Sequence, residues 1–518
     1  MRKTFTAVPG ILCADQLENM CGRSGRALER ANQSSTLVED FAKAQDYPSL
    51  WVIGACSKRY LAEYTANRMC QLTEDSIAQA DWENTQTYAQ RVKVLSFESH
   101  CYATDFGDGA TDIIKTSIET YILHLHDAPI FPNLRKLDFG FVCWAYYEYL
   151  RFFIAPSLRI FCLRYRPGYQ NAPDLAQILS PIPPLCPELA YLTLHEVESD
   201  FGDEAFLGVC LPYKDMVLGW STLTRVDLAE AHPEAIRHLG RCGNLRHLRM
   251  CVDTDLQWPP AEVPGFKNGL SELVINARRG RWVAAIIECM SNATIAVTCV
   301  QVICSRERNR YRRRNLDVLA QTLDAASLRE FTYASYRTFE GRDDPLPLSV
   351  LLQYARFREL TRFVVGCCGF PSFGDDALAD LVSAWPHLQH LSIRGSLKAF
   401  DDRVDPHITL ASLATLARYC PALGYFSCKP SSAKVPPLPD LVAAPRETAE
   451  PNSPSIELGF NVVGLPIENA EAVANYICAV FKDRQCTVTF KGRAQNGDDA
   501  VSMAKWEKVQ SLVGAPED

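Results

Sequence analysis

A short pattern of apolar positions recurs along the 518-residue chain. It consists of a leucine, two variable residues, an apolar residue, one variable residue and a second apolar residue. The last two apolar positions are two residues apart, so they face the same side of a short strand. Successive patterns start 22 to 35 residues apart, with a mean of about 29. The starts are Leu134, Leu158, Leu189, Leu223, Leu245, Leu270, Val297, Leu328, Leu360, Leu388 and Leu423.

Prolines and amphipathic stretches precede these patterns. Five of the starting leucines have proline two residues earlier, and proline both fixes φ and ends a preceding helix. Before Leu388, for example, Leu378, Leu381 and Val382 form an apolar stripe at helical spacing. Asp375 or Asp376 is the expected N-cap of that helix. Each unit is therefore predicted to be a helix, a proline turn and a strand.

A repeat of this length that begins with leucine is typical of leucine-rich repeats, which span ~20–29 residues. The predicted fold is an α/β solenoid, a horseshoe with a parallel sheet and outer helices. A doubly wound α/β protein is the alternative. We expect the solenoid at 91–429, a proline-rich loop at 430–455, and capping repeats with a tail at 456–518. Residues 1–90 do not follow the repeat and are expected to be a small helical region.

Charge and composition narrow the class of partner. The net charge of −8 disfavours non-specific binding to nucleic acid, and no run of 18 apolar residues predicts a membrane span. The 20 cysteines are scattered among apolar residues without a C-x-x-C pair, which favours buried thiols in a reducing compartment. We therefore expect a cytoplasmic or nuclear protein.

A search for catalytic chemistry finds no nucleophile elbow, phosphate loop or zinc-protease motif. No cofactor, metal site or enzymatic activity is expected. The acidic stretch His195–Glu204 lacks the ligand order of a calcium loop and is interpreted as solvated. The basic run Arg306–Arg314 is either a nuclear-import or anionic-partner patch or an exposed loop between repeats, and the loop is the favoured interpretation.

The layout resembles the fungal, basidiomycete-type F-box proteins that carry leucine-rich repeats, with a degenerate F-box. The segments that carry the resemblance are "VPGIL" (Val8–Leu12), "YPSLWVIGACSKRYLAEYTANRM" (Tyr47–Met69) and "DWENTQTYAQRVKVLSF" (Asp81–Phe97). In that family the box binds a Skp-type adaptor of a cullin ubiquitin ligase, and the repeats hold the protein substrate. The resemblance thus implies a non-catalytic substrate receptor.

The resemblance also implies particular adaptor contacts. They are Pro9, Ile11, Leu12, Leu50, Trp51, Ile53 and Leu61. The alternative for each is a core residue of a small helical cap on the solenoid. Here Gly10 stands where the family usually has an acidic residue, which leaves open a leucine-rich-repeat scaffold without a ubiquitin-ligase role.

A partner is expected to bind the concave face of the sheet. Residues between the buried positions of each strand point to that face, and aromatic and arginine side chains dominate binding hot spots. The candidates are Tyr191, Arg225, Asp227, His247, Arg249, Arg362, His390 and Arg394. Arg225, His247 and Arg249 on adjacent units favour an acidic partner, and the alternative is a solvated sheet face.

Overall fold

The structure, a computed structural model, describes the repeat region in segments. The described residues are 89–98, 128–140, 144–165, 179–196, 217–252, 258–260, 265–266, 269–290, 293–335, 346–366, 374–394, 408–428, 430–431, 434–437, 455–461, 465, 467–482, 484–491 and 497–514. All seven predicted adaptor contacts, from Pro9 to Leu61, lie outside the described residues. So does most of the proline-rich segment 430–455.

The chain divides into two compact units after Leu158. In the first unit, strand β1 (Val94–Glu98) pairs in parallel with β2 (Lys136–Gly140). A 3-10 helix, η1 (Trp144–Phe153), follows. Its buried Tyr147 contacts Phe139 of β2 edge to face, with 5.5 Å between ring centroids.

The second unit contains a row of parallel strands, each hydrogen-bonded to the next. Ten of these strands have four to six residues, whereas β7 and β8 have ten each. The strands are β3 (Ile160–Tyr165), β4 (Tyr191–Glu196), β5 (Arg225–Leu228), β6 (His247–Val252), β7 (Leu270–Arg279), β8 (Val297–Arg306), β9 (Glu330–Ser335), β10 (Arg362–Gly366), β11 (His390–Arg394), β12 (Tyr425–Cys428), β13 (Ile456–Asn461) and β14 (Cys486–Lys491).

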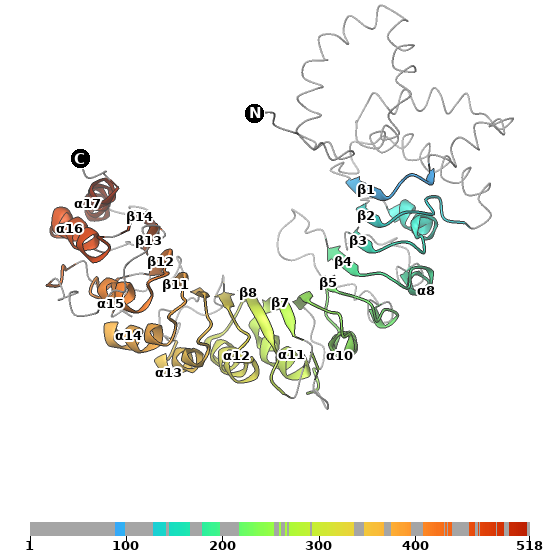
Figure 1. The fold of residues 1–518 in the computed structure, drawn as a ribbon, viewed down its shortest axis with the longest axis horizontal. Helices are drawn as coiled ribbons and strands as arrows, with labels where there is room; N and C mark the ends of the chain where they lie inside the picture. Colours follow the sequence, from blue (N-terminus) through green and yellow to red (C-terminus); the bar gives the residue numbers. More distant parts are fainter. Residues whose placement is uncertain are drawn as a thin grey trace, which may run out of the picture. The chain divides into compact units, whose positions relative to one another are not determined.

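Helices connect these strands and cover one face of the sheet, while the other face is left open on the inner side of the curve (Figure 1). The connecting elements are α8 (Ile182–Leu185), α10 (Pro233–Arg241), η2 (Gly280–Trp282), α11 (Val283–Met290), α12 (Asn309–Thr322), α13 (Leu348–Leu352), η3 (Gln353–Arg356), α14 (Asp375–Ser383), α15 (Ser412–Tyr419) and α16 (Ala470–Val480). A further helix, α17 (Gly497–Val513), follows β14. This arrangement confirms the prediction of an α/β array of parallel strands with outer helices, and it is compatible with a solenoid.

The recurring apolar positions form the core between strands and helices. All eleven predicted starting residues are buried, with at most 3% of their surface exposed. The two inward positions of the strands stack in register, as in Phe331, Phe363 and Leu391 on β9, β10 and β11. Phe331 and Phe363 are stacked with 5.6 Å between ring centroids. Each unit therefore buries its apolar residues against the next unit, as a repeat array requires.

The same turn precedes most of the strands. The amide of the starting leucine donates to the carbonyl three residues earlier, as Leu388 does to Trp385 at 3.1 Å and Leu423 to Cys420 at 3.0 Å. The next two amides then share one carbonyl of the preceding unit, as those of Gln389 and His390 share that of Thr361. This repeated pairing sets the register, so that equivalent residues become lateral neighbours.

Two local expectations were wrong. Neither Asp375 nor Asp376 is the N-cap of α14, because that position is occupied by Gly374, which has no side chain to cap the helix. Asp375 instead accepts hydrogen bonds from the backbone amide and hydroxyl of Thr409 in the following unit, at 2.8 and 2.5 Å. The basic run Arg306–Arg314 is not a loop: it contains the last residue of β8 and the first turns of α12.

Candidate functional site

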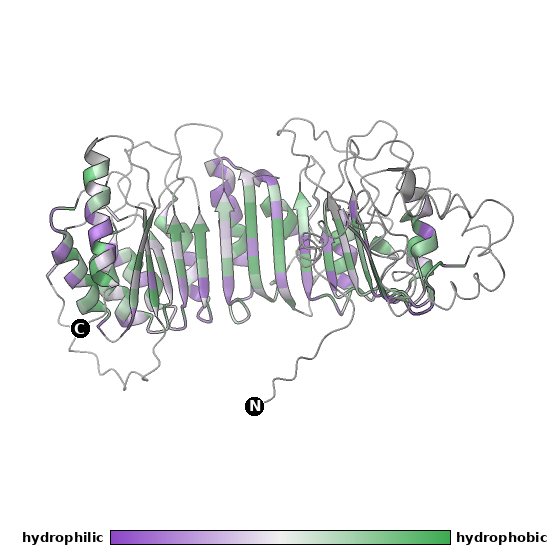
Figure 2. Ribbon diagram, turned by 90° about the horizontal axis from the view of Figure 1, so that it is seen from above, coloured by the Kyte–Doolittle hydropathy of each residue, from purple (hydrophilic) through white to green (hydrophobic). Residues whose placement is uncertain are grey.

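The open face of the sheet carries one in-register row of side chains, which we call the inner row. It contains one residue from each strand between β4 and β12, at the first position or, on β7 and β8, the third. Figure 2 shows this open face. The inner row consists of Tyr191, Arg225, His247, Glu272, Cys299, Glu330, Arg362, His390 and Tyr425.

Five predicted site residues belong to this row and fall into two groups. Tyr191, Arg225 and His247 are neighbours on β4, β5 and β6, and Arg362 and His390 are neighbours on β10 and β11. Tyr191 is 43% exposed and the His247 side chain 41%, so both can contact a partner. The predicted aromatic and cationic residues thus lie at the two flanks of the row.

The other three predicted residues, Arg249, Asp227 and Arg394, lie outside the inner row and differ in how they are exposed or described. Arg249 is exposed on the same face of β6, two residues after His247 of the inner row. Asp227 lies beside it in register on β5 but is only 6% exposed. A side chain buried among its neighbours offers little surface to a partner. Arg394 is the last residue of β11, and its side chain lies outside the described residues.

Sequence reasoning missed the centre of the row, which is acidic. Glu272, Cys299 and Glu330 are adjacent on β7, β8 and β9. His247 Nδ1 lies 3.4 Å from Glu272 Oε2, and Cys299 Sγ donates to Glu330 Oε2 at 3.9 Å. The row therefore reads Tyr, Arg, His, Glu, Cys, Glu, Arg, His, Tyr. Its acidic centre is flanked on both sides by one arginine and one histidine, and then by a tyrosine.

The thiol at the centre is not poised as a nucleophile. Burial, together with the negative charges of Glu330 and Glu272, raises the pKa of Cys299 to about 11. A thiol with that pKa stays protonated at neutral pH and acts as a weak hydrogen-bond donor. At the β12 end, His390 and Tyr425 stack with ring centroids 4.2 Å apart and planes 10° apart. The described part of the row is thus suited to binding by charge and stacking.

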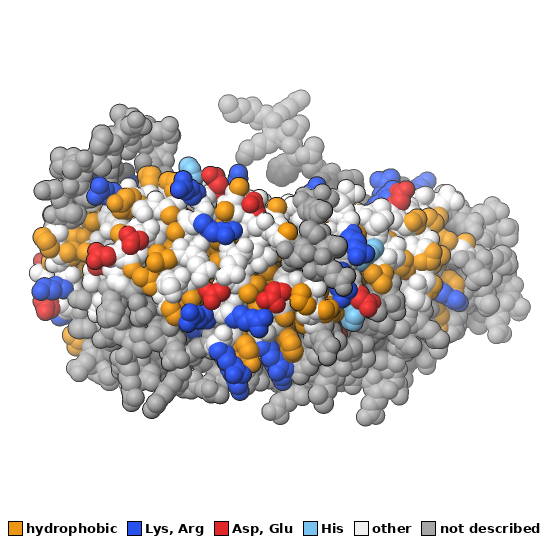
Figure 3. All heavy atoms as spheres, turned by 90° about the horizontal axis from the view of Figure 1, so that it is seen from below, with side chains coloured by type: hydrophobic (Ala, Val, Ile, Leu, Met, Phe, Trp, Pro, Cys, Tyr) orange, Lys and Arg blue, Asp and Glu red, His pale blue; other side chains and the backbone are white. Residues whose placement is uncertain are grey.

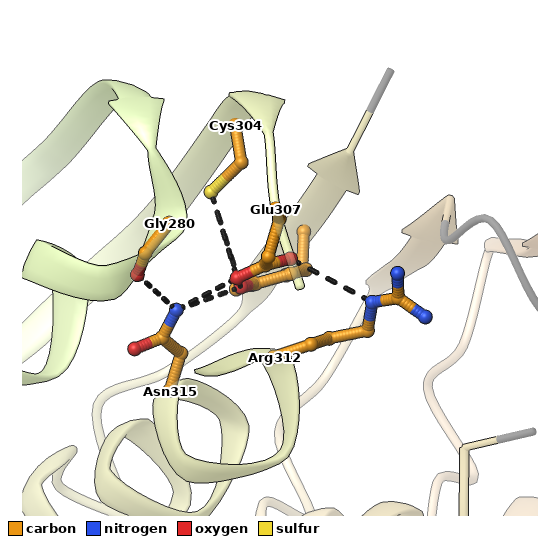
Figure 4. Close-up of polar contacts among 6 residues, drawn as sticks. Gly280, Cys304, Glu307, Arg312 and Asn315 are labelled. Atoms are coloured by element: carbon orange, nitrogen blue, oxygen red, sulfur yellow. Dashed lines mark hydrogen bonds and ion pairs between the residues drawn. The ribbon is translucent and has the colours of Figure 1, made fainter. Parts of the chain in front are cut away.

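A second polar cluster lies inside the protein, between β8, α12 and β9 (Figure 4). The carboxylate of Glu307 is at its centre, where Oε1 accepts hydrogen bonds from Tyr333 Oη at 2.5 Å and Asn315 Nδ2 at 2.8 Å. Arg312 Nε lies 3.6 Å from Oε2, and both side chains are at most 1% exposed. Asn315 also donates to the carbonyl of Gly280 at 2.6 Å. The cluster thus ties η2, α12 and β9 together.

The protonation of Glu307 depends on the side chains around it. Burial raises the pKa of the Glu307 carboxyl, while the hydrogen bonds from Tyr333 and Asn315 and the charge of Arg312 oppose that rise. Burial also raises the pKa of Tyr333, so its hydroxyl stays a donor. The sequence signal that could have indicated the cluster is a tyrosine at an inward strand position, because a buried hydroxyl needs a hydrogen-bond partner.

A cationic pocket lies next to this cluster, at the carboxyl ends of β7 and β8. We call it the arginine pocket; its volume is about 400 Å³. It is lined by Arg279, Gly280, Arg281, Glu307, Arg308, Arg310 and Tyr311. Figure 3 shows basic side chains gathered at the middle of the lower edge on the helix-covered side. Five of the nine residues in the basic run 306–314 contribute to the pocket or to the Glu307 cluster.

Comparison with known proteins identifies no family. The sequence matches no protein-family model, and no curated protein matches it significantly. Within the described segments, no three histidine, cysteine, aspartate or glutamate side chains gather as a metal site would require. No helix in that part of the chain is long and apolar enough to cross a membrane. Function must therefore be inferred from the inner row and the arginine pocket.

Proposed function

We propose that the chain is a leucine-rich-repeat receptor that binds a client protein along its inner row in the cytoplasm or nucleus. We further propose that residues 1–90 act as a degenerate F-box, which recruits the client to a Skp/cullin ubiquitin ligase without catalysis by the chain itself. The observation that carries the first proposal is the unbroken register of nine aromatic, charged and thiol side chains on the open sheet face.

The dimensions of the inner row fit an extended segment of a client. Eight steps between parallel strands separate Tyr191 from Tyr425, and at ~4.8 Å per step they span about 38 Å along the sheet. An extended peptide that rises ~3.3 Å per residue would cover this distance with roughly 11 or 12 residues. The client segment therefore runs across the strands rather than along them.

The charges of the row define the chemistry of that segment. Glu272 and Glu330 favour a basic side chain opposite the centre, whereas Arg225 and Arg362 favour acidic groups on both sides of it. Tyr191 and Tyr425 at the ends provide aromatic surface, which is common in binding hot spots. A segment with the opposite order of charges would be repelled, so the row can discriminate between clients.

Affinity purification of the full chain, with mass spectrometry of the bound proteins, tests both parts. A variant with Arg225→Glu and Arg362→Glu reverses the flanks of the inner row, and Arg241→Glu changes an exposed residue of α10 as a control. We expect the client to be lost from the first variant only, while a Skp-type adaptor stays bound to both. Retention of every bound protein by the flank variant would refute the inner row as the client site.

Deletion of residues 1–70 tests the adaptor link separately. We expect this variant to keep the client and lose the Skp-type adaptor, provided that its circular dichroism melt matches that of the full chain. Gly10, at a position that is usually acidic in F-boxes, favours the second candidate function, a repeat scaffold without a ligase role. Recovery of the client with no adaptor, from the full chain at micromolar concentration, would establish that alternative.

A further inference from the structure

Positive charge is concentrated in one short region of an acidic protein. Residues 278–314 contain nine arginines, two glutamates and neither lysine nor aspartate, a net charge of +7 in a chain whose total is −8. Like charges so close together repel one another, and the repulsive energy depends on screening by solvent and salt. Such a concentration makes the region a candidate site for an anionic ligand.

The two long strands gather this charge at one place. β7 and β8 have ten residues each and extend beyond their neighbours, and they end at Arg279 and Arg306. The hydrophilic residues at the upper ends of the middle strands are visible in Figure 2. The turn η2 follows β7 directly, and α12 begins three residues after β8. Four arginines, 279, 281, 308 and 310, thereby come to line the arginine pocket.

Among the described lining residues, Glu307 is the one acid, and it belongs to the buried cluster. Glu307 accepts hydrogen bonds from Tyr333 and Asn315 and faces Arg312, all of which lie in the buried cluster. Four arginines and one glutamate give the lining a net charge of +3, and Arg312 behind Glu307 adds a further positive charge. The described lining of the pocket is thus rich in guanidinium groups, which are the side chains that bind anions best.

Aromatic neighbours orient two of the guanidinium groups. The Arg310 guanidinium lies over the ring of Tyr311, 4.7 Å from its centroid, and donates to its hydroxyl at 2.7 Å. Arg281 lies over the ring of Trp282 at 4.6 Å. A planar guanidinium matches two oxygens of a phosphate at once, and a stacked side chain has less conformational freedom to lose on binding.

We infer that the arginine pocket binds a phosphate monoester. A volume of about 400 Å³ lies within the ~300–1,000 Å³ range of ligand pockets, and it exceeds the size of a lone phosphate. Tyr311 in the wall offers apolar surface to the group that carries the ester. The phosphate belongs either to a phosphorylated residue of a partner protein or to a free small molecule, and both sources share the chemistry that the arginines recognise.

Binding to the purified full chain tests this inference without a client or an adaptor, so it is independent of the proposed function. The probes are a phosphoserine peptide, a phosphotyrosine peptide, their unphosphorylated forms, phenyl phosphate and inorganic phosphate, titrated by calorimetry. We expect the phosphorylated probes to bind and the unphosphorylated peptides not to bind. Tighter binding of the peptides than of phenyl phosphate would indicate a protein partner, and the reverse would indicate a small molecule.

A pair of matched variants separates the pocket from general charge attraction. Arg308→Gln with Arg310→Gln removes two exposed pocket residues at the start of α12. Arg313→Gln with Arg314→Gln removes two exposed arginines of α12 that do not line the pocket. We expect the first pair to weaken binding at least about tenfold, from the loss of charge-assisted hydrogen bonds, and the second less than about threefold. Equal weakening by both pairs, or no binding of any phosphorylated probe, would overturn the inference.

Discussion

Replacing Arg312 with methionine should destabilise the protein strongly at neutral pH. Methionine keeps most of the length of the side chain but removes the charge that faces Glu307 Oε2 at 3.6 Å in a region that is at most 1% exposed. Removing one partner of a buried ion pair costs about 3–5 kcal/mol, because the other charge stays buried without compensation. We expect a loss of this size in the free energy of unfolding.

The effect should depend on pH in a definite direction. Arg312 lowers the pKa of Glu307, so in the variant the native carboxyl has a pKa raised further above the ordinary value of 4.5. Below pH 4.5 the Glu307 carboxyl is protonated in both the native and the unfolded state, and no buried negative charge remains without a partner. As pH rises from there through the native pKa, the unfolded state loses its proton first and the native state becomes progressively less favourable.

Urea denaturation of the full chain at pH 5 and pH 7.5, followed by circular dichroism, measures this difference. The destabilisation by Arg312→Met should be larger at pH 7.5 than at pH 5. The double variant Glu307→Gln/Arg312→Met is the control, since glutamine removes the charge but can still accept from Tyr333 and Asn315; it should recover most of the loss at pH 7.5. A loss below about 1 kcal/mol, or an equal loss at both pH values, would refute the reasoning.

Three further predictions concern close packing. A Cβ on Gly280 would lie 2.6 Å from Glu307 Cγ, so Gly280→Ala should lower the free energy of unfolding, measured by urea denaturation, by about 1–3 kcal/mol. Gly366→Ala is the control and should be nearly neutral, because the nearest atom to its added Cβ lies at 3.8 Å. Equal effects of the two substitutions would contradict this prediction. Trp385→Phe removes an indole N–H that donates to the buried carbonyl of Tyr354 at 3.2 Å, so it should also lower the free energy of unfolding by about 1–3 kcal/mol. An unchanged urea midpoint would contradict this prediction. Burial raises the pKa of Cys420 to about 12, so iodoacetamide at pH 8 should label it, by mass spectrometry, only after unfolding.

The strand positions were predictable because each is fixed by a local apolar spacing. Leu189, Leu192 and Leu194 have 0% exposure, and the residue between the last two is only half-buried on the other face. The same spacing placed Leu378, Leu381 and Val382 in the core. The helix cap was not predictable in this way, since Asp375 can bond its own helix or the next unit with similar local geometry. Its bond to Thr409 depends on the distance between units, which a single sequence segment does not contain.

The inner row was predicted only at its flanks for a related reason. A search for arginine and aromatic residues selects Tyr191, Arg225 and Arg362 but passes over glutamates, which are depleted at interfaces in general. The significance of Glu272 and Glu330 comes from their position in register between two cationic flanks. Alignment of the strands by their starting leucines would have revealed this order, because the register follows the repeat.

The buried Glu307 cluster holds in place the segments that form the arginine pocket. A buried acid and a surface group of arginines, taken separately, are both unfavourable features of an acidic repeat protein. In the structure, Glu307 directly follows the long strand β8 and accepts a hydrogen bond from Asn315 on α12, which also donates to the carbonyl of Gly280 in η2. The segments η2 and α12, with the N-cap of α12, carry Arg281, Arg308 and Arg310. The cluster therefore holds the pocket walls in place. It follows that Glu307→Gln, which keeps the hydrogen bonds, should preserve phosphate binding, whereas Asn315→Leu, which breaks them, should weaken it even though Asn315 does not line the pocket.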